Sequence, residues 1–325
     1  MTNVGLIGYG KAGRVFHAPL IKSVDGLHLH KIVEHRGDAE VNALLADPEV
    51  ELVVIATPNE SHFDLGRRAL LAGKHVVVDK PFTVTSDAAR QLIDLARERN
   101  RILTVFHNRR WEGDFLTIRR LLDQNALGRV VFYEARFDRF RNEPRLGAWR
   151  ESSASGSGIL YDLGSHLIDQ AIVLFGKPES IIADVRRERD FGEADDAFDI
   201  WMHYPRLKAS LTAGMLVRER TPRFTVRGTH GTFVKFGLDP QEAELAAGRT
   251  PRDVDWGKEP REQWGTLITD HGEEIVETLP GSYQSFYENV RDVIAGRVRL
   301  AVDPQDACTT IELIERAAAS KRSDR

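Results

Sequence analysis

The most constraining feature of the sequence is a glycine-rich segment that directly follows a short apolar run at residues 4–7. Six residues then fit the pattern G-x-G-x-x-G: Gly8, Tyr9, Gly10, Lys11, Ala12 and Gly13. Gly8 permits a tight turn, Gly10 lets a pyrophosphate approach the backbone, and Gly13 allows the next helix to pack closely. The N-terminus of that helix offers N–H groups to phosphates. The context predicts a dinucleotide site rather than a glycine turn that binds nothing.

Two charged residues after the next predicted strand, residues 29–33, bear on the choice of cofactor. Glu34 stands about where a carboxylate would bind the ribose of NAD, and it would repel the 2′-phosphate of NADP. Arg36 would attract that phosphate. The residues themselves therefore leave the choice between NAD and NADP open.

Short apolar runs alternate with helical patterns through the first third of the chain. Near-continuous apolar strands are typical of a parallel sheet covered on both faces, and strand–helix alternation predicts a doubly wound α/β domain of the Rossmann type. The expected strands are residues 4–7, 29–33, 52–56, 75–78 and 102–106. The expected helices are residues 12–22, 41–46, 61–72 and 86–99.

One connection in this domain is unusually short. Only six residues separate Glu34 from the helical pattern at Val41, so a single short helix must lead to the strand at Leu52. A nucleotide-binding fold usually has a further helix and strand here. We therefore expect the domain to lack about one helix and one strand after residue 36, beside the adenosine pocket.

The pattern changes after residue 118, which predicts a Rossmann domain over 1–118 and a second domain over 119–325. Polar–apolar alternation there favours an open, mostly antiparallel sheet beside α-helices. The expected strands are residues 130–138, 181–189, 198–204, 208–216, 223–227 and 232–236. The expected helices are residues 163–175, 284–295 and 304–319, and the last is expected to pack on the first domain.

Composition limits the possible partners and the cellular location. The net charge of −4 gives no electrostatic reason to expect nucleic acid or an anionic membrane as partner. No run of 18 apolar residues predicts a membrane span, and the first strand begins so early that we expect no signal peptide. The single cysteine, Cys308, excludes an intramolecular disulfide and favours a reducing, cytoplasmic location.

A lysine is predicted at the ligand-binding edge of the first sheet. Asp79-Lys80-Pro81 follows the fourth expected strand, and ligands in such sheets bind outside the carboxyl ends of the strands. The ammonium of Lys80 could bind a substrate hydroxyl and stabilise the alkoxide, while Pro81 stiffens the turn. The alternative is an ordinary solvated lysine before a turn.

An aspartate and a histidine form the second candidate. Asp162 and His166 are four residues apart, so they share one face of a helix, and Asp169 continues that polar stripe. Histidine suits general acid–base work. The alternatives are an N-cap aspartate with a core histidine, or a cation held by these three side chains. Without a zinc motif, we expect no metal.

Other polar and aromatic residues stand where substrate or cofactor would bind. His107-Asn108-Arg109-Arg110-Trp111 follows the fifth expected strand, and Asn108 could bind the nicotinamide ribose or the substrate. Trp149 lies in a loop that could cover the nicotinamide, although such an aromatic side chain also suits packing. Tyr161, next to Asp162, is a further candidate for substrate binding.

Taken together, these motifs resemble the Gfo/Idh/MocA family of nicotinamide-dependent sugar and polyol oxidoreductases over nearly the whole chain. The marks are the glycine motif, Ala56-Thr57-Pro58-Asn59 with His62, Asp79-Lys80-Pro81, and Asp162-x-Gly164-x-His166. Residues 16–20, 107–111 and 163–170 are more similar to the scyllo-inositol dehydrogenase branch. The sequence departs from the family at Asp79, where Glu is usual, and in the short segment after Arg36.

The resemblance implies reversible oxidation of a secondary hydroxyl on a cyclic polyol or sugar, with Lys80, Asp162 and His166 as catalytic residues. It favours NADP over NAD, and it implies a homodimer or homotetramer formed through the free face of the second sheet. The residues implied around the cofactor, besides the glycine motif, Glu34, Arg36 and Asn108, are Thr57, Pro58, Asn59, His62, Asp79, Lys80 and Pro81.

Two other functions remain open at this point. A cofactor-sensing binding protein without turnover would be consistent with the short segment after Arg36, but not with the retained Lys80, Asp162 and His166. An oxidoreductase acting on a non-sugar substrate, such as a dihydrodiol or a tetrapyrrole, would need a broad apolar pocket.

Overall fold

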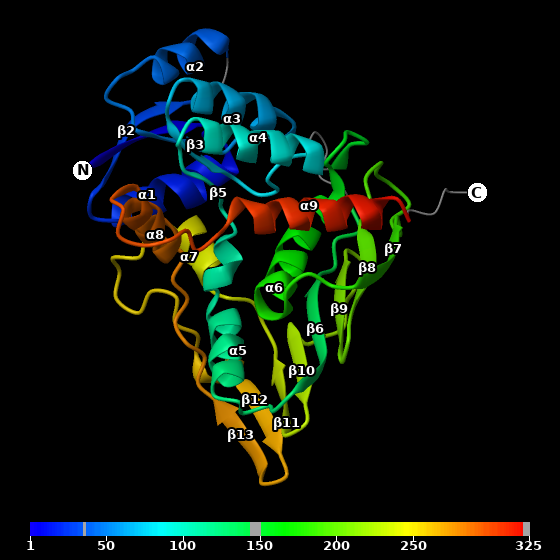
Figure 1. Cartoon of the computed structure of the whole chain (residues 1–325). Helices are drawn as coiled ribbons and strands as arrows, with labels where there is room; N and C mark the ends of the chain where they lie inside the picture. The colour runs from blue at the N-terminus through cyan, green and yellow to red at the C-terminus, as the bar shows by residue number, and fades with distance from the viewer. Residues whose placement is uncertain (35–36, 144–150, 321–325) are drawn as a thin grey trace. The chain divides into compact units, whose positions relative to one another are not determined.

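The computed structural model of the chain describes residues 1–34, 37–143 and 151–320. The chain divides into two compact units, each with its own sheet (Figure 1). Unit 1 consists of Met1–Trp111, Pro240–Gly257 and Ser282–Ile311. Unit 2 consists of Glu112–Asp239, Lys258–Gly281 and Glu312–Arg325. This division differs from a single boundary after residue 118, because two later segments return to unit 1.

The sheet of unit 1 is parallel and has the order β2-β1-β3-β4-β5. Its inner strands β3 and β4 are runs of Val, Ile and Leu that are almost entirely buried. Such runs suit a sheet with helices on both faces, so the predicted doubly wound fold is confirmed. The strands are β1 (Thr2–Ile7), β2 (Leu27–Val33), β3 (Leu52–Ile55), β4 (His75–Val78) and β5 (Leu103–Val105).

Helices connect the consecutive strands of this sheet, further helical elements of unit 1 follow β5, and α3 packs beside α4 (Figure 1). The helix after the glycine motif begins as a π-helix, η1, and continues as α1, where we expected one α-helix. The α4 helix starts at Thr85, whose hydroxyl accepts the N–H of Ala88. The elements are η1 (Ala12–His17), α1 (Ala18–Ser23), α2 (Asp38–Leu45), η2 (Asn59–Ser61), α3 (His62–Leu71), α4 (Ser86–Glu98), η3 (Asn108–Trp111), α7 (Gln241–Ala246) and α8 (Gln284–Ile294).

The strand β2 forms one edge of this sheet. Within the described residues, α2 is the one helix between β2 and β3, and no strand pairs with the outer side of β2. This edge of the sheet is therefore bounded by β2, by Glu34 after it, and by α2.

The sheet of unit 2 has eight strands in the order β13-β12-β11-β10-β6-β9-β8-β7. Neighbouring strands are antiparallel except for β6 and β9, which are parallel. Burial largely alternates along β6, as the sequence pattern predicted. The strands are β6 (Val130–Asp138), β7 (Ser180–Arg186), β8 (Ala197–Tyr204), β9 (Leu207–Gly214), β10 (Phe224–Gly228), β11 (Gly231–Lys235), β12 (Gly265–Thr269) and β13 (Gly272–Val276).

The helices of unit 2 include one that the sequence analysis did not predict, α5 (Gly113–Asp123), which contains residue 118. The chain after residue 159 forms a π-helix, η5 (Leu160–Gly164), and continues as α6 (Ser165–Phe175). The remaining elements are η6 (Arg261–Gln263) and α9 (Pro304–Ala318), whose first half lies in unit 1. In the described part of the chain, no helix has the length and apolar character needed to span a bilayer.

Candidate functional site

The glycine motif has the geometry that a dinucleotide loop needs. Gly8 has a φ of +97° and donates its N–H to the carbonyl of Val33 at 2.7 Å, which joins the loop to β2. A Cβ on Gly13 would lie 2.0 Å from the carbonyl oxygen of Gly8, so only glycine fits there. A Cβ on Gly10 would meet nothing within 4 Å. This open backbone is where a pyrophosphate can approach the helix that starts at Ala12.

Most residues predicted around the cofactor follow the carboxyl ends of the parallel strands in unit 1. Tyr9 and Lys11 belong to the loop after β1, and Glu34 follows β2. The other segments are Thr57-Pro58-Asn59 after β3, Asp79-Lys80-Pro81 after β4, and Asn108 after β5. Because the strands are parallel, all five segments emerge at one edge of the sheet, where open α/β sheets bind ligands.

His62 joins two of these segments. Its Nε2 lies 2.9 Å from the carbonyl oxygen of Thr57, and its Nδ1 lies 2.9 Å from that of Pro81. The side chain is buried. Burial lowers the pKa of His62 below its ordinary value, although Asp79 acts in the opposite direction. His62 therefore braces the turns that carry Thr57 and Lys80, and is not itself open to a ligand.

Asp79 is a buried carboxylate directly before Lys80. Its Oδ1 accepts the backbone N–H of Lys80 at 2.8 Å, and Nε2 of His17 lies 3.6 Å from the same oxygen. Burial opposes ionisation, but His17, Lys80 and His62 outweigh it and hold the pKa of Asp79 below its ordinary value. The Lys80–Pro81 peptide bond is cis. Lys80 thus extends from a turn fixed by buried charge.

A carboxylate from a distant part of the sequence lies among the cations of this edge. Glu242 of α7 accepts from Lys11 Nζ at 3.0 Å and from Arg109 Nη2 at 3.2 Å. Burial opposes ionisation here too, but Arg109, Lys11 and Lys80 hold the pKa of Glu242 below its ordinary value. The glycine loop, the turn after β4 and the segment after β5 are therefore electrostatically linked through α7.

The second catalytic candidate lies in unit 2, where the chain enters α6. His166 is buried and Asp162 is half-buried, at the junction of η5 with α6. Asp162 is not an N-cap, because the element begins after Ile159 without a side-chain cap. Asp195 anchors this start by accepting the N–H of Leu160 at 2.8 Å. π-Helical turns often occur at functional sites.

Tyr161 shares this segment and is half-buried. Burial, with the nearby charges of Glu315 and Asp195, raises the pKa of Tyr161 to about 12. Its hydroxyl therefore stays protonated near neutral pH and can donate a hydrogen bond. Two predicted site residues, Arg36 and Trp149, lie outside the described residues.

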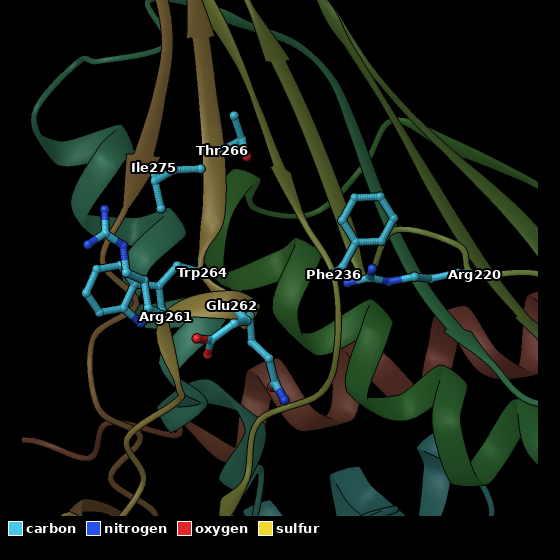
Figure 2. A pocket seen from close by; sticks show the side chains of 8 residues that line it. Arg220, Phe236, Arg261, Glu262, Trp264, Thr266 and Ile275 are labelled. Carbon is cyan, nitrogen blue, oxygen red and sulfur yellow. The ribbon is translucent and has the colours of Figure 1, made fainter.

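Unit 2 also has a shallow cavity of about 430 Å³ beside β12 and β13 (Figure 2). Two arginines and two aromatic rings contribute to its lining: Arg220, Arg261, Phe236 and Trp264. The guanidinium of Arg220 lies over the ring of Phe236 at 4.8 Å from its centre. The cavity contains neither Asp162 nor His166, so it is separate from the candidate catalytic helix.

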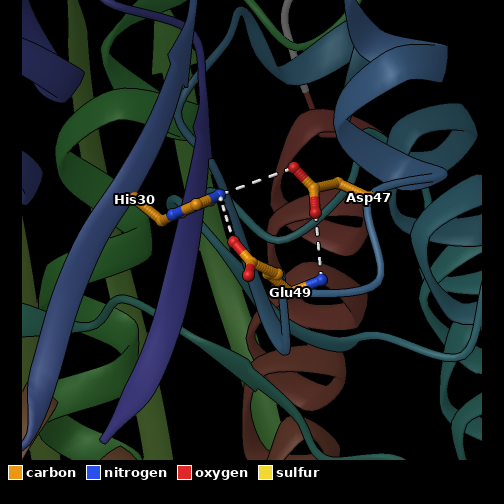
Figure 3. A group of neighbouring side chains, drawn as sticks. All are labelled: His30, Asp47 and Glu49. Atoms are coloured by element: carbon orange, nitrogen blue, oxygen red, sulfur yellow. Dashed lines mark hydrogen bonds and ion pairs between the residues drawn. The ribbon is translucent and has the colours of Figure 1, made fainter.

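Three potential metal ligands lie together on the outer edge of unit 1 (Figure 3). Nε2 of His30 is 3.5 Å from Asp47 and 3.7 Å from Glu49. Lys31 also reaches Asp47, at 4.0 Å, so the cluster already contains a cationic side chain. Among the described residues this is the one group of three ligand atoms within 4.8 Å of one another, and Asp162, His166 and Asp169 do not form another.

Sequence reasoning did not identify three residues of the unit 1 site as functional: His17, Glu242 and Tyr287. His17 stands in the segment 16–20, which we noted only for its resemblance to a branch of the family. Glu242 and Tyr287 carry no local signal, because each approaches the strand ends from a segment more than 120 residues beyond Asn108.

Comparison with known proteins agrees with this geometry. Residues 2–107 match the family model described as "Oxidoreductase family, NAD-binding Rossmann fold". Residues 119–325 match "Oxidoreductase family, C-terminal alpha/beta domain". Together the two models cover most of the chain.

Individual relatives are similar over nearly their full length. The uncharacterized oxidoreductase YdgJ of Escherichia coli is 44% identical over 96% of this chain and 94% of its own. The scyllo-inositol 2-dehydrogenase (NADP(+)) IolW of Bacillus subtilis is 37% identical over 99% and 94%. The solved structure of the putative oxidoreductase yvaA from Bacillus subtilis superposes with a TM-score of 0.93, at 35% identity over 98% and 95%. The chain therefore belongs to the Gfo/Idh/MocA family of oxidoreductases.

Proposed function

We propose that the protein is an NAD(P)-dependent dehydrogenase that oxidises a secondary hydroxyl of a cyclic polyol or sugar. The observation that carries this proposal is the position of Lys80, which follows the carboxyl end of β4 on a turn fixed by Asp79 and His62. The relative IolW, a scyllo-inositol 2-dehydrogenase, supports an inositol-like substrate.

The residues of the glycine motif fit a dinucleotide, since Gly10 leaves open backbone and Gly8 and Gly13 make the tight turn. A bound nicotinamide supplies the acceptor for the hydride that leaves the carbinol carbon. His166 takes the hydroxyl proton as general base. Lys80 donates to the developing alkoxide oxygen and stabilises its charge. Asp162 orients His166 or binds a neighbouring substrate hydroxyl, and Asn108, Tyr161 and Trp149 contact substrate.

This proposal is tested with Lys80→Ala and His166→Ala in a screen of inositols and sugars, followed at 340 nm. Each variant is expected to keep its fold and to lose about 10²–10⁴ in kcat. A Lys11→Ala variant serves as a cation-removal control, expected to affect cofactor affinity more than turnover. Full turnover in either catalytic variant would remove these residues from the mechanism.

For the cofactor we propose NADP, with Arg36 contacting the 2′-phosphate and Glu34 the ribose. The named NADP dependence of IolW supports this choice. Arg36→Ala should weaken NADPH binding by about tenfold and leave NADH binding nearly unchanged, since one charge-assisted contact is removed. Equal effects on both cofactors would count against this role.

We also propose that the protein is a cytoplasmic homodimer or homotetramer associated through the outer face of the unit 2 sheet. Apolar side chains on several of its strands are exposed, including Val131, Ile182, Ile268 and Ile275. An exposed sheet face of this kind favours association. Ile182→Asp should shift the mass measured by light scattering towards the monomer, and an unchanged mass would place the interface elsewhere.

A further inference from the structure

A buried chain of polar side chains leads from α8 to the turn that carries Lys80, and the proposed mechanism does not use it. The hydroxyl of Tyr287 lies 2.5 Å from Nδ1 of His17. Nε2 of the same ring lies 3.6 Å from Oδ1 of Asp79. That oxygen accepts the backbone N–H of Lys80 at 2.8 Å. All three side chains are buried.

The Tyr287 hydroxyl and the Asp79 carboxylate together favour one direction for the hydrogen bond between Tyr287 and His17. Burial raises the pKa of Tyr287 well above its ordinary value, and the charge of Asp79 acts in the same direction. Tyr287 therefore keeps its proton, and its hydroxyl can donate a hydrogen bond to Nδ1 of His17. When Nδ1 accepts this hydrogen bond, the ring N–H is on Nε2, which faces Asp79.

Asp79 needs such a partner, because an ionised carboxylate without one is costly to bury. The charged or titratable groups that act on it are His17, Lys80 and His62. Of these groups, His17 is held in turn by a further buried side chain, the hydroxyl of Tyr287.

Aromatic rings pack around His17 and Tyr287 and leave these two side chains little freedom to rearrange. The ring of Phe106 lies 4.4 Å from that of His17 and 5.8 Å from that of Tyr287, centre to centre. Phe286 packs edge-on against Tyr287 at 5.2 Å. In this apolar surrounding, the Tyr287–His17 hydrogen bond and the His17–Asp79 contact are polar links between α8 and the turn after β4.

We propose that Tyr287 and His17 are positioning residues that hold the Asp79 carboxylate, and through it the Lys80 backbone, in one arrangement. The inference rests on the proposed function of Lys80. It assigns to α8 a direct influence on turnover, although no residue of α8 is proposed to contact substrate.

The first test is Tyr287→Phe, which removes one hydroxyl and keeps the ring. We expect kcat to fall about fivefold to tenfold, because the buried hydrogen bond between Tyr287 and His17 is lost. The cofactor Kd should stay within about twofold. The matched control is Tyr133→Phe, because the Tyr133 hydroxyl is buried and has no hydrogen-bond partner among the described residues. An unchanged kcat in Tyr287→Phe would overturn the proposal.

The second test separates positioning from packing. His17→Gln keeps an acceptor for Tyr287 and a donor for Asp79, whereas His17→Leu fills similar space without either. We expect Gln to retain several times more kcat than Leu, at comparable KM and comparable melting temperature. Equal kcat in the two variants would show that His17 only fills space, and would overturn the proposal.

A third measurement needs no substrate and so separates this inference from the proposed function. Carboxyl 13C NMR of Asp79 should show a higher pKa in His17→Leu than in the wild type, because His17 is the leading group that lowers it. If the wild type lacks turnover but this shift is seen, the proposed function is wrong, whereas the link from Tyr287 through His17 to Asp79 is supported. If the pKa of Asp79 is the same in His17→Leu and in the wild type, His17 does not stabilise the Asp79 carboxylate, and the proposal is overturned.

Discussion

The two units fill their interiors in different ways. In unit 1 the centre of the sheet is entirely apolar, and Val53, Val54, Val76 and Val77 have no exposed surface. In unit 2 a group of ionisable side chains is buried together beside the sheet. We call it the buried charge cluster, and its members are Glu112, Asp114, Arg223, Lys235 and Glu259.

The charge cluster is held by specific contacts. Lys235 Nζ lies 3.0 Å from Glu259, and Arg223 lies 3.6 Å from Glu112 and stacks on Phe137. Arg223 also donates to Gln170 of α6, the helix that carries His166. Two cations here face three carboxyl groups, so the charges balance when Asp114 is protonated.

Polar groups are therefore placed differently in the two units. In unit 1 polar residues gather at the carboxyl ends of the strands, where a ligand can use them, and the sheet itself stays apolar. In unit 2 charges lie behind the helix of the proposed base, where they fix its position at a cost in stability. The two units should therefore respond differently to mutation and to pH.

The largest effect is expected from Gly13→Ala in unit 1. The new Cβ would lie 2.0 Å from the carbonyl of Gly8, so the loop must move. We expect a loss of about 4 kcal/mol in unfolding free energy and of more than about 100-fold in cofactor affinity. Urea unfolding and cofactor titration measure both.

Gly10→Ala is the matched variant, because its Cβ meets nothing within 4 Å in the protein. It should keep the wild-type unfolding free energy and still bind cofactor at least about tenfold more weakly, since the pyrophosphate approaches there. Normal binding by this variant would contradict the assignment of the loop.

The next largest effect is expected from Lys235→Met in unit 2. The substitution leaves Glu259 buried without its cation, and breaking such a pair costs about 3 kcal/mol or more. The double variant Lys235→Met, Glu259→Leu should recover much of this loss, because no unpaired charge remains. If the single variant unfolds at the wild-type urea midpoint, losing Lys235 leaves no costly unpaired charge on Glu259, and this prediction is wrong.

Asp114 gives unit 2 a pH dependence. Burial, with the charge of Glu112, raises its pKa to about 7, whereas an unfolded aspartate titrates near 3.9. The folded state thus binds the proton more tightly, so this stability is complete below about pH 4 and is lost as pH rises through about 7. Asp114→Asn should be more stable than the wild type by about 3 kcal/mol at pH 6 and nearly equal to it near pH 4.

That prediction is checked by urea unfolding of both proteins at the two pH values. Asn can still accept the N–H of Phe115 that Asp114 accepts now, so the local turn is conserved. A difference between the two proteins that is the same at both pH values would mean that folding does not raise the pKa of Asp114.

The smallest effect is expected at an exposed ion pair of unit 1. Arg68 on α3 reaches Asp38 on α2 at 2.8 Å, and Asp38 is largely exposed to water. Arg68→Met should cost about 0.5 kcal/mol, and the cost should shrink at high salt. If Arg68→Met lost as much unfolding free energy as Lys235→Met, the expected difference between exposed and buried ion pairs would be wrong.

The sequence predicted the elements that have a strong local signal. The apolar runs at 52–56 and 75–78 became β3 and β4, and the position of Lys80 followed from that order. The spacing of Phe115, Ile118 and Leu121 could have revealed α5, and we did not use it. β13 carries little signal, because nearly all of its residues are exposed.

Other features depend on contacts that no local pattern encodes. Glu242 approaches the glycine loop, and Tyr287 approaches the turn after β4, from segments that return to unit 1 late in the chain. The π-helical start of the segment before α6 also differs from the α-helical spacing that paired Asp162 with His166. Tertiary contacts decide both features.

Hydride transfer as proposed here requires that unit 1 bind a nicotinamide dinucleotide. Its most direct test is a fluorescence titration of the purified protein with NADPH and, separately, with NADH. We expect saturable binding of NADPH with a Kd on the order of micromolar, weaker binding of NADH, and binding at least about tenfold weaker in Gly10→Ala. Absence of binding for both cofactors would contradict the account and would favour a family member that has lost its dinucleotide site.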